Sequence, residues 1–162
     1  MRDAAPTTIY LKDYTPFGYL VDNVHLTFDL AANATRVTSR IAFRPNPEAS
    51  DRSFFLHGEQ LKLIRSSIDG ADVSPTLTPE GLTVAAPDAP FVWEAEVEID
   101  PGNNTALEGL YMSNGMYCTQ CEAEGFRKIT YYPDRPDVMS TFTVRSNGDL
   151  PVLLSNGNPS GK

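Results

Sequence analysis

The chain has 162 residues, a formal net charge of −8, 41% hydrophobic residues and 21% charged residues. These values predict a globular protein of about one domain. They argue against nucleic acid and anionic membrane surfaces as partners, because proteins that bind those surfaces usually carry basic patches. The apolar runs are too short to span a membrane, and the N-terminus lacks the apolar core of a secretory signal. We therefore expect a cytoplasmic protein with reduced thiols.

The first half of the chain predicts an arm followed by a hairpin. Residues 1–18 contain Pro6, Pro16 and Gly18 without sustained periodicity, which is typical of an extended arm. In Val24–Leu30 and again in 37–43, side chains alternate between one apolar and one polar face. The pair predicts two antiparallel strands.

Further strands follow at short spacing. Phe91–Ile99 is the clearest, and its polar face consists of Glu94, Glu96 and Glu98, which we expect to be solvated rather than to bind a metal. An Asp-Gly turn is predicted at residues 68–70. Weaker strands are predicted over 53–56, 60–66, 73–77, 82–84, 141–145 and 151–155. With 13 Pro, 11 Gly and no long amphipathic pattern, the chain is predicted to be all-β, an antiparallel twisted β-sandwich. At most one helical turn is expected, near Arg135–Met139.

The C-terminal residues predict an incomplete hairpin. The segment 153–158 reads L-L-S-N-G-N, a strand running into an Asn-Gly turn, yet no returning strand follows. We therefore expect a β-sandwich domain over 19–162 that is truncated before its last strands. Its unpaired C-terminal edge would favour association.

Residues 105–137 break the strand pattern and contain both cysteines, Cys118 and Cys121. A Cys2His2 zinc site would require His25 and His57 to converge on them from distant positions. A redox dithiol would require a helix N-terminus in a βαβ setting, which the sequence lacks. The simplest interpretation is two reduced, packed thiols that bind no metal.

The carboxylates of the same segment suggest a different chemistry. Gln120, Glu122 and Glu124 alternate, so an extended backbone would project them to one side. An amide oxygen beside a carboxylate is a good receptor for a primary ammonium group, which brings three donors and a charge. On the spacing alone, a solvated polar face is the favoured interpretation.

Four motifs carry a resemblance to a known family. They are T-A-L-E-G-L-Y, C-T-Q-C-E-A-E-G-F-R, I-T-Y-Y-P-D-R-P-D-V and L-L-S-N-G-N, in that order. Together they resemble the N-terminal domain of the bacterial aminopeptidase N family, gluzincin zinc metalloaminopeptidases, over about residues 14–158. The resemblance implies a saddle-shaped β domain that packs on a thermolysin-like catalytic domain of the same polypeptide.

The resemblance also implies roles for single residues. Gln120 and Glu122 match the family's residues that bind the free α-amino group of the peptide substrate. The motifs G-A-M-E-N and H-E-x-x-H are missing, so catalytic residues and the zinc cofactor are expected only in a full-length enzyme, and this chain alone is expected to be inactive. Loop support and domain packing are expected of Glu124, Arg127, Tyr131, Tyr132, Asp134 and Arg135. The alternative function is a stand-alone β-sandwich module that binds a ligand or a protein.

Overall fold

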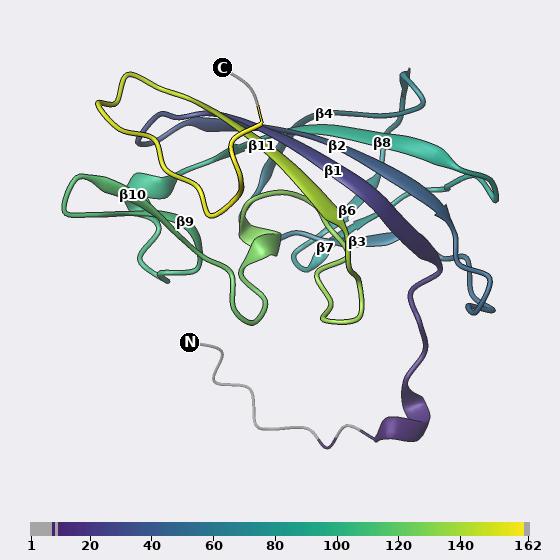
Figure 1. Ribbon diagram of the computed structural model, residues 1–162. Coiled ribbons are helices and arrows are strands. Elements are labelled where there is room, and N and C mark those ends of the chain that lie inside the picture. The colour runs from purple at the N-terminus through teal and green to yellow at the C-terminus, as the bar shows by residue number, and fades with distance from the viewer. Residues whose placement is uncertain (1–7, 9, 161–162) are drawn as a thin grey trace.

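A six-stranded sheet runs the length of the molecule (Figure 1). The structure, a computed structural model, describes residue 8 and residues 10–160. In spatial order the sheet consists of β11 (Thr141–Asn147), β1 (Tyr19–Asp29), β2 (Thr35–Pro45), β8 (Phe91–Ile99), β4 (Lys62–Ile68) and β5 (Ala71–Asp72). Neighbouring strands are antiparallel except β1 and β11, which are parallel.

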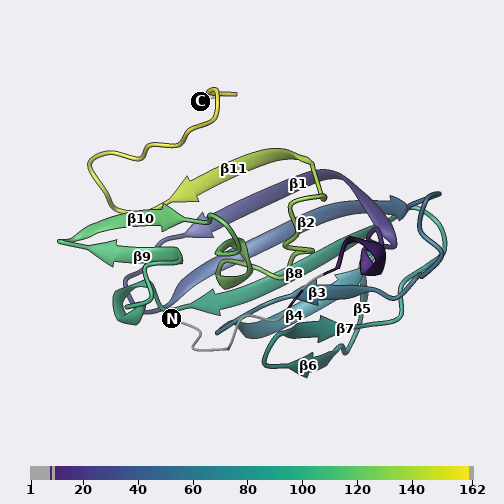
Figure 2. The same cartoon turned by 90° about the horizontal axis from the view of Figure 1, so that it is seen from below.

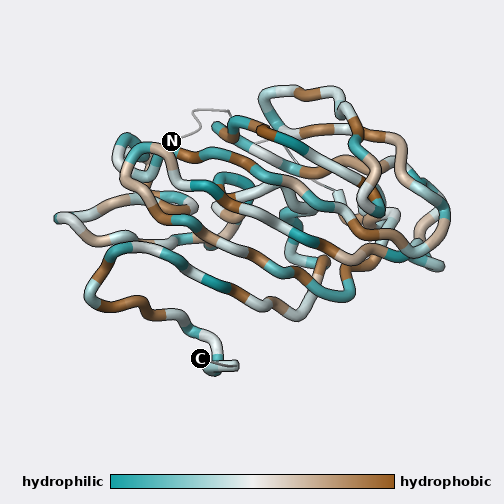
Figure 3. The backbone as a smooth tube through the Cα atoms, turned by 90° about the horizontal axis from the view of Figure 1, so that it is seen from above, coloured by the Kyte–Doolittle hydropathy of each residue, from teal (hydrophilic) through white to brown (hydrophobic). Residues whose placement is uncertain are grey.

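Alternating side chains explain why these strands form. In β8 every second residue is buried, from Phe91 to Ile99, and Figure 3 shows the matching alternation of hydropathy along the neighbouring strands. Both Val21 and Val24 are buried although they are three residues apart. A register shift between Val21 and Asn23 accounts for this, because a bulge returns the side chains to the core face.

A second, smaller sheet covers part of the inner face (Figure 2). It consists of β3 (Phe55–His57), β7 (Gly81–Thr83) and β6 (Thr76–Thr78). Leu56 and Leu82 from this sheet join Trp93 and Ile41 from the large sheet in one core, where all four are fully buried. Phe54 lies in the same core, with its ring centroid 4.9 Å from that of Phe43. Two layers around one apolar core confirm the predicted all-β, sandwich-like fold.

The outer face of the large sheet carries a ladder of ion pairs. Glu96 of β8 contacts Arg36 of β2 at 3.1 Å and Arg65 of β4 at 2.9 Å. Glu98 contacts Arg36 at 2.9 Å and Lys62 at 3.0 Å. The three β8 glutamates thus lie on the solvent side, as predicted, and cross-strand basic residues pair with them.

Irregular elements complete the fold. A separate hairpin is formed by β9 (Gly109–Ser113) and β10 (Met116–Gln120). Three single 3-10 turns are present in the described residues, η1 (Leu11–Asp13), η2 (Pro101–Asn103) and η3 (Phe126–Lys128). None of the helices found there is long and apolar enough to cross a bilayer.

Several expectations are corrected by this architecture. The β11–β1 pairing is parallel, because the chain crosses from the far end of the molecule before β11 instead of turning back in a hairpin. Residues 151–155 form no strand; they are exposed and Pro151 has no N–H to donate. Arg135–Met139 holds one hydrogen-bonded turn, from the Val138 N–H to the Arg135 carbonyl, and no helix. Of the expected arm, residues 1–7 and 9 lie outside the described residues.

Candidate functional site

The β9–β10 hairpin places Gln120 at the edge of the molecule. Its turn is Asn114-Gly115, with φ of 50° and 80°, the backbone that a two-residue hairpin turn requires. Gln120 ends β10 and pairs with Gly109, at the end of the hairpin away from that turn. The sequence pattern did not predict this hairpin, although Asn-Gly was the signal that could have revealed it.

A tight turn follows and presents the two predicted site residues. The Gly125 N–H donates to the Cys121 carbonyl at 3.0 Å, which closes the turn over residues 121–125. Gly125 packs so tightly that an added Cβ would lie 2.5 Å from the Gln120 carbonyl oxygen. The Gln120 amide Nε2 is 3.5 Å from the Glu122 carbonyl oxygen, and both side chains are exposed. A cis peptide bond joins Glu122 to Ala123.

The two glutamates of this turn differ in their partners. Glu124 lies 3.4 Å from the Arg127 guanidinium, with its Oε2 directed at Nη2. Within residue 8 and residues 10–160, no hydrogen bond or ion pair engages the Glu122 carboxylate. The turn therefore offers one carboxylate, next to Gln120, that a ligand can bind.

Arg127 is the main support of this turn. Arg127 is the second residue of η3 and is only 8% exposed. Its Nε donates to Asp134 Oδ2 at 2.9 Å. Its backbone N–H donates to the same oxygen at 3.1 Å, and Nη2 donates to the Asp134 carbonyl at 3.1 Å. A buried arginine that donates several charge-assisted bonds to one residue fixes the spacing between the two segments.

His57 joins this support from the small sheet. The Asp134 N–H donates to His57 Nδ1 at 3.2 Å, and His57 forms an isolated β-bridge with Tyr132. Burial, and then the positive charge of Arg127, lower the pKa of His57 below its ordinary value of 6.5. The neutral imidazole is the form that accepts this hydrogen bond.

Lys128 ties the hairpin to the loop after β3. Its Nζ lies 3.2 Å from Glu59 Oε1 and 3.6 Å from Glu108 Oε2, and its side chain is largely buried. Gly109 lies against it, because an added Cβ would come within 2.7 Å of the Lys128 Cβ, and its φ of 72° favours glycine. The turn is thus fixed on one side by Arg127 to Asp134 and on the other by Lys128 to Glu59 and Glu108.

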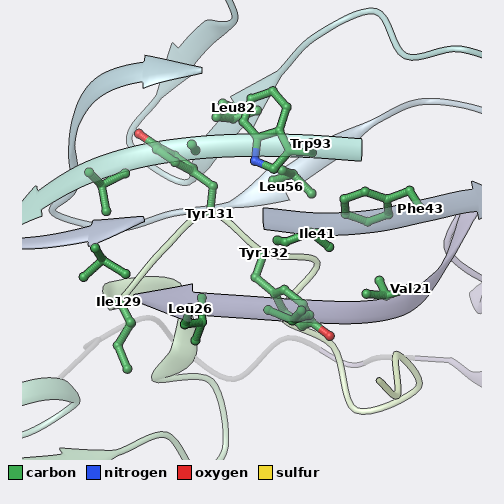
Figure 4. Close-up of a cluster of buried hydrophobic side chains, with 14 of the residues drawn as sticks. Val21, Leu26, Ile41, Phe43, Leu56, Leu82, Trp93, Ile129, Tyr131 and Tyr132 are labelled. Carbon is green, nitrogen blue, oxygen red and sulfur yellow. The ribbon is translucent and has the colours of Figure 1, made fainter. Parts of the chain in front are cut away.

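Aromatic residues anchor the segment that follows. Figure 4 shows Tyr131 and Tyr132 directed to opposite sides of the chain, Tyr131 toward Trp93 and Leu82. Both tyrosines are buried, and burial together with the Asp134 charge raises the pKa of Tyr132 to about 12. The Thr130 hydroxyl donates to Ser39 at 3.0 Å in the core. The two tyrosines thus anchor the segment in the core of this domain, and the packing on another domain that was predicted for them stays a prediction.

The cysteines and histidines do not fit a zinc site. Cys118 and Cys121 are free, half-buried thiols, and burial raises the pKa of the Cys121 thiol, which disfavours the thiolate that metal binding needs. The Nδ1 of His57 already accepts a hydrogen bond. In the described part of the chain no three His, Cys, Asp or Glu residues could hold a metal ion.

Comparison with known proteins identifies the scaffold. The model of the peptidase M1 N-terminal domain matches residues 19–161. The chain belongs to the peptidase M1 N-terminal domain family. Aminopeptidase N of Caulobacter vibrioides is 49% identical over 98% of this chain, and aminopeptidase N of Escherichia coli is 44% identical over 94%.

Those M1 relatives are much longer. The chain spans 19% of the Caulobacter protein and 18% of the Escherichia coli protein. A crystal structure of Legionella pneumophila aminopeptidase A in complex with aspartic acid has a TM-score of 0.83 and 30% identity, covering 91% of this chain and 18% of that one. An M1 zinc metallopeptidase from Deinococcus radiodurans, at 17% identity and a TM-score of 0.66, shares the fold.

Against this M1 scaffold, the sequence located the exposed pair but not its full support. Gln120, at the end of β10, and Glu122, in the exposed turn that follows, do lie side by side, and Glu124, Arg127 and Asp134 do support this turn. His57, Glu59 and Lys128 were missed, since the first two come from the end of β3 and the loop after it, about 70 residues away in sequence. Arg135 supports a different segment, because its Nη2 donates to the Thr15 carbonyl at 2.7 Å.

Proposed function

We propose that this chain is the N-terminal domain of a zinc-dependent aminopeptidase that removes N-terminal amino acids from peptides. In this proposal Gln120 and Glu122 bind the α-ammonium group of the substrate, and the domain packs on a catalytic domain of the same polypeptide in the cytoplasm. The observation that carries it is the exposed Glu122 carboxylate, which has no partner in the described residues, beside Gln120 in a braced turn.

The chemistry of the pair suits an ammonium ion. A primary ammonium group donates three hydrogen bonds and carries one positive charge, and the carboxylate of Glu122 and the amide oxygen of Gln120 are both acceptors. A charge-assisted bond of this kind is about twice as strong as a neutral one. Holding the ammonium at a fixed place would admit only the first peptide bond to the reaction centre, which favours exopeptidase action.

Zinc would belong to the catalytic domain. The Deinococcus radiodurans protein of the same fold is an M1 zinc metallopeptidase, which supports zinc in the full-length enzyme. When bound there, zinc would polarise the scissile carbonyl and activate water. The residues of this chain would bind and orient the substrate only, because they supply no metal site in the described part.

The sharpest test compares two exposed glutamates, one in the turn and one outside it, in the polypeptide that includes the catalytic domain. Glu122→Gln removes the charge that faces the ammonium, so we expect kcat/KM to fall about 30- to 100-fold, mainly through a higher KM. Glu80→Gln, at an exposed carboxylate outside the turn, is the control and should stay within about threefold. Zinc content should be equal in both. Unchanged kinetics for Glu122→Gln would remove it from the site.

The chain on its own gives a second test. The purified 162-residue protein, assayed on an aminoacyl chromogenic substrate with and without added zinc, should show no turnover. Turnover that a chelator abolishes would contradict the proposal that zinc and the catalytic residues belong to the catalytic domain. A coding sequence that continues into G-x-M-E-N and H-E-x-x-H would exclude the alternative of a stand-alone binding module.

A further inference from the structure

We infer that Arg127 and Asp134, completed by His57, form a positioning clasp that sets the orientation of Glu122 toward the substrate ammonium. The inference rests on the proposed function of Gln120 and Glu122. It concerns residues that do not touch the substrate but hold the turn that does.

The clasp is a closed set of polar contacts in a largely buried place. Arg127 makes three hydrogen bonds to Asp134, two to the carboxylate oxygen Oδ2 and one to the backbone carbonyl. The side chain of Asp134 is only 11% exposed, and that of Arg127 only 9%. Such a pair is costly to break, because removing one partner leaves the other charged and poorly solvated.

The clasp reaches the site through Glu124 and η3. Arg127 Nη2 holds Glu124 at 3.4 Å, and Glu124 lies two residues after Glu122 in the same turn. Because Arg127 engages Glu124, the two carboxylates of the turn differ in their partners, and that of Glu122 has none among the described residues. At the end of the turn, the backbone of Gly125 packs closely against the Gln120 carbonyl oxygen.

The clasp is itself attached to the sandwich at two points. Asp134 N–H donates to His57 Nδ1, and the Glu59 N–H donates to the Arg127 carbonyl at 2.9 Å. The groups around the His57 ring are Arg127 from η3, Glu124 from the turn, Asp134 from the following segment and the Phe55 ring, with centroids 5.1 Å apart. These two hydrogen bonds therefore fix the position of the site turn relative to β3, which lies about 70 residues earlier in the sequence.

Amide hydrogen exchange of the 162-residue chain tests the clasp without reference to any activity. Arg127→Lys keeps the charge but cannot make the Nε and Nη2 bonds together. We expect exchange over residues 119–126 to accelerate at least tenfold while β1, β2 and β8 stay protected. Arg135→Lys is the matched control, since Arg135 forms a similar pair with Asp137 at 2.7 Å away from the turn. It should leave residues 119–126 unchanged.

Kinetics of the full enzyme test the positioning role. Arg127→Lys should raise KM about tenfold and change kcat less than threefold at unchanged zinc content. Added to Glu122→Gln, it should cause less than threefold further loss, because a positioning residue has no effect once the group it positions is absent. A merely structural residue would instead lower kcat as well, and its effect on kcat/KM would add to that of Glu122→Gln.

The outcomes separate this inference from the proposed function. If Glu122→Gln has its large effect while Arg127→Lys changes neither KM nor exchange, the clasp is refuted and the ammonium site stands. If Glu122→Gln has no effect, the ammonium site is refuted, and accelerated exchange in Arg127→Lys would still establish the clasp as the support of the turn. Additive losses in the double variant would refute positioning.

Discussion

The large sheet and the site segment are stabilised in different ways. The sheet gains its stability from long alternating strands and a core in which Val24, Val37, Ile41, Trp93 and Val97 are fully buried. The site segment, residues 119–135, is anchored by aromatic residues only in its second half, and polar contacts from Arg127 and Lys128 hold the exposed turn at its start. The apolar core tolerates small shifts in any one contact, whereas the site depends on a few directional bonds.

This difference matters for function. A binding residue must keep its orientation to within a fraction of an ångström, which directional bonds provide better than apolar contact does. The price is local sensitivity, because the loss of one bond affects the orientation of the whole turn. The following predictions separate effects on the core from effects on the turn.

The largest expected effect comes from the core. Trp93→Ala removes a fully buried indole between the two sheets, so the free energy of unfolding should fall by about 3–5 kcal/mol. Urea denaturation of the chain measures this. Leu154→Ala, at a side chain that is 92% exposed, is the control and should change nothing. An equal loss in both variants would contradict the assigned core.

A smaller effect is expected in the turn. Gly125→Ala places a Cβ 2.5 Å from the Gln120 carbonyl oxygen and 3.1 Å from the Gly109 nitrogen, both backbone atoms. Relieving such overlap typically costs about 1–3 kcal/mol. Hydrogen exchange should accelerate over residues 119–126 and hardly at all in β8. Gly157→Ala, where the nearest atom to the added Cβ is Ser155 Oγ at 4.0 Å, should leave exchange unchanged.

The His57 contact predicts a dependence on pH. Because its pKa is lowered in the folded state, the unfolded chain binds the proton more readily, and stability should fall as pH decreases from 6.5. His57→Asn places an amide oxygen near the position of Nδ1 and does not titrate. In this variant, the protection of residues 119–135 from amide exchange, relative to an unstructured peptide at the same pH, should depend less on pH. If the pH dependence of this protection is the same in His57→Asn, protonation of His57 is not linked to the stability of the segment.

The smallest effect is expected on the outer face. Glu96→Gln weakens two partly exposed ion pairs, which contribute about 0.5–1 kcal/mol together. Denaturation at low salt and in 1 M salt should show that the difference shrinks with ionic strength. Glu80→Gln is the control, because its carboxylate takes part in no ion pair among residues 10–160. A salt-independent loss would argue against an electrostatic origin.

The sequence predicts the sheet better than the site, for physical reasons. β1, β2 and β8 were predictable because one face of each is buried and the other wet, so hydropathy alternates. The Asp69-Gly70 turn was also predicted correctly, with φ of 50° and 80°. The β9–β10 hairpin has half-buried residues on both faces, so its alternation is lost even though Asn114-Gly115 marks the turn.

Before the same dipeptide, at Asn156-Gly157, the strand predicted over residues 151–155 is not formed. A strand forms only where a neighbouring segment pairs with it, and residues 151–155 have no such partner among the described residues. In the site, alternation predicted Gln120, Glu122 and Glu124 on one side, but only their contacts distinguish Glu122 from Glu124. Those contacts depend on His57 and Arg127, which the fold brings together and local sequence does not.

The central claim, that Glu122 recognises a positive α-amino group, is tested most directly by inhibition of the full enzyme. The inhibition constants of an α-amino hydroxamate and of its counterpart without the amino group should be measured for the natural protein and for Glu122→Gln. We predict that the natural protein prefers the amino compound strongly and that Glu122→Gln loses about 30- to 100-fold of this preference, while the constant for the counterpart stays within about threefold. An equal loss for both compounds would contradict recognition of the ammonium by Glu122.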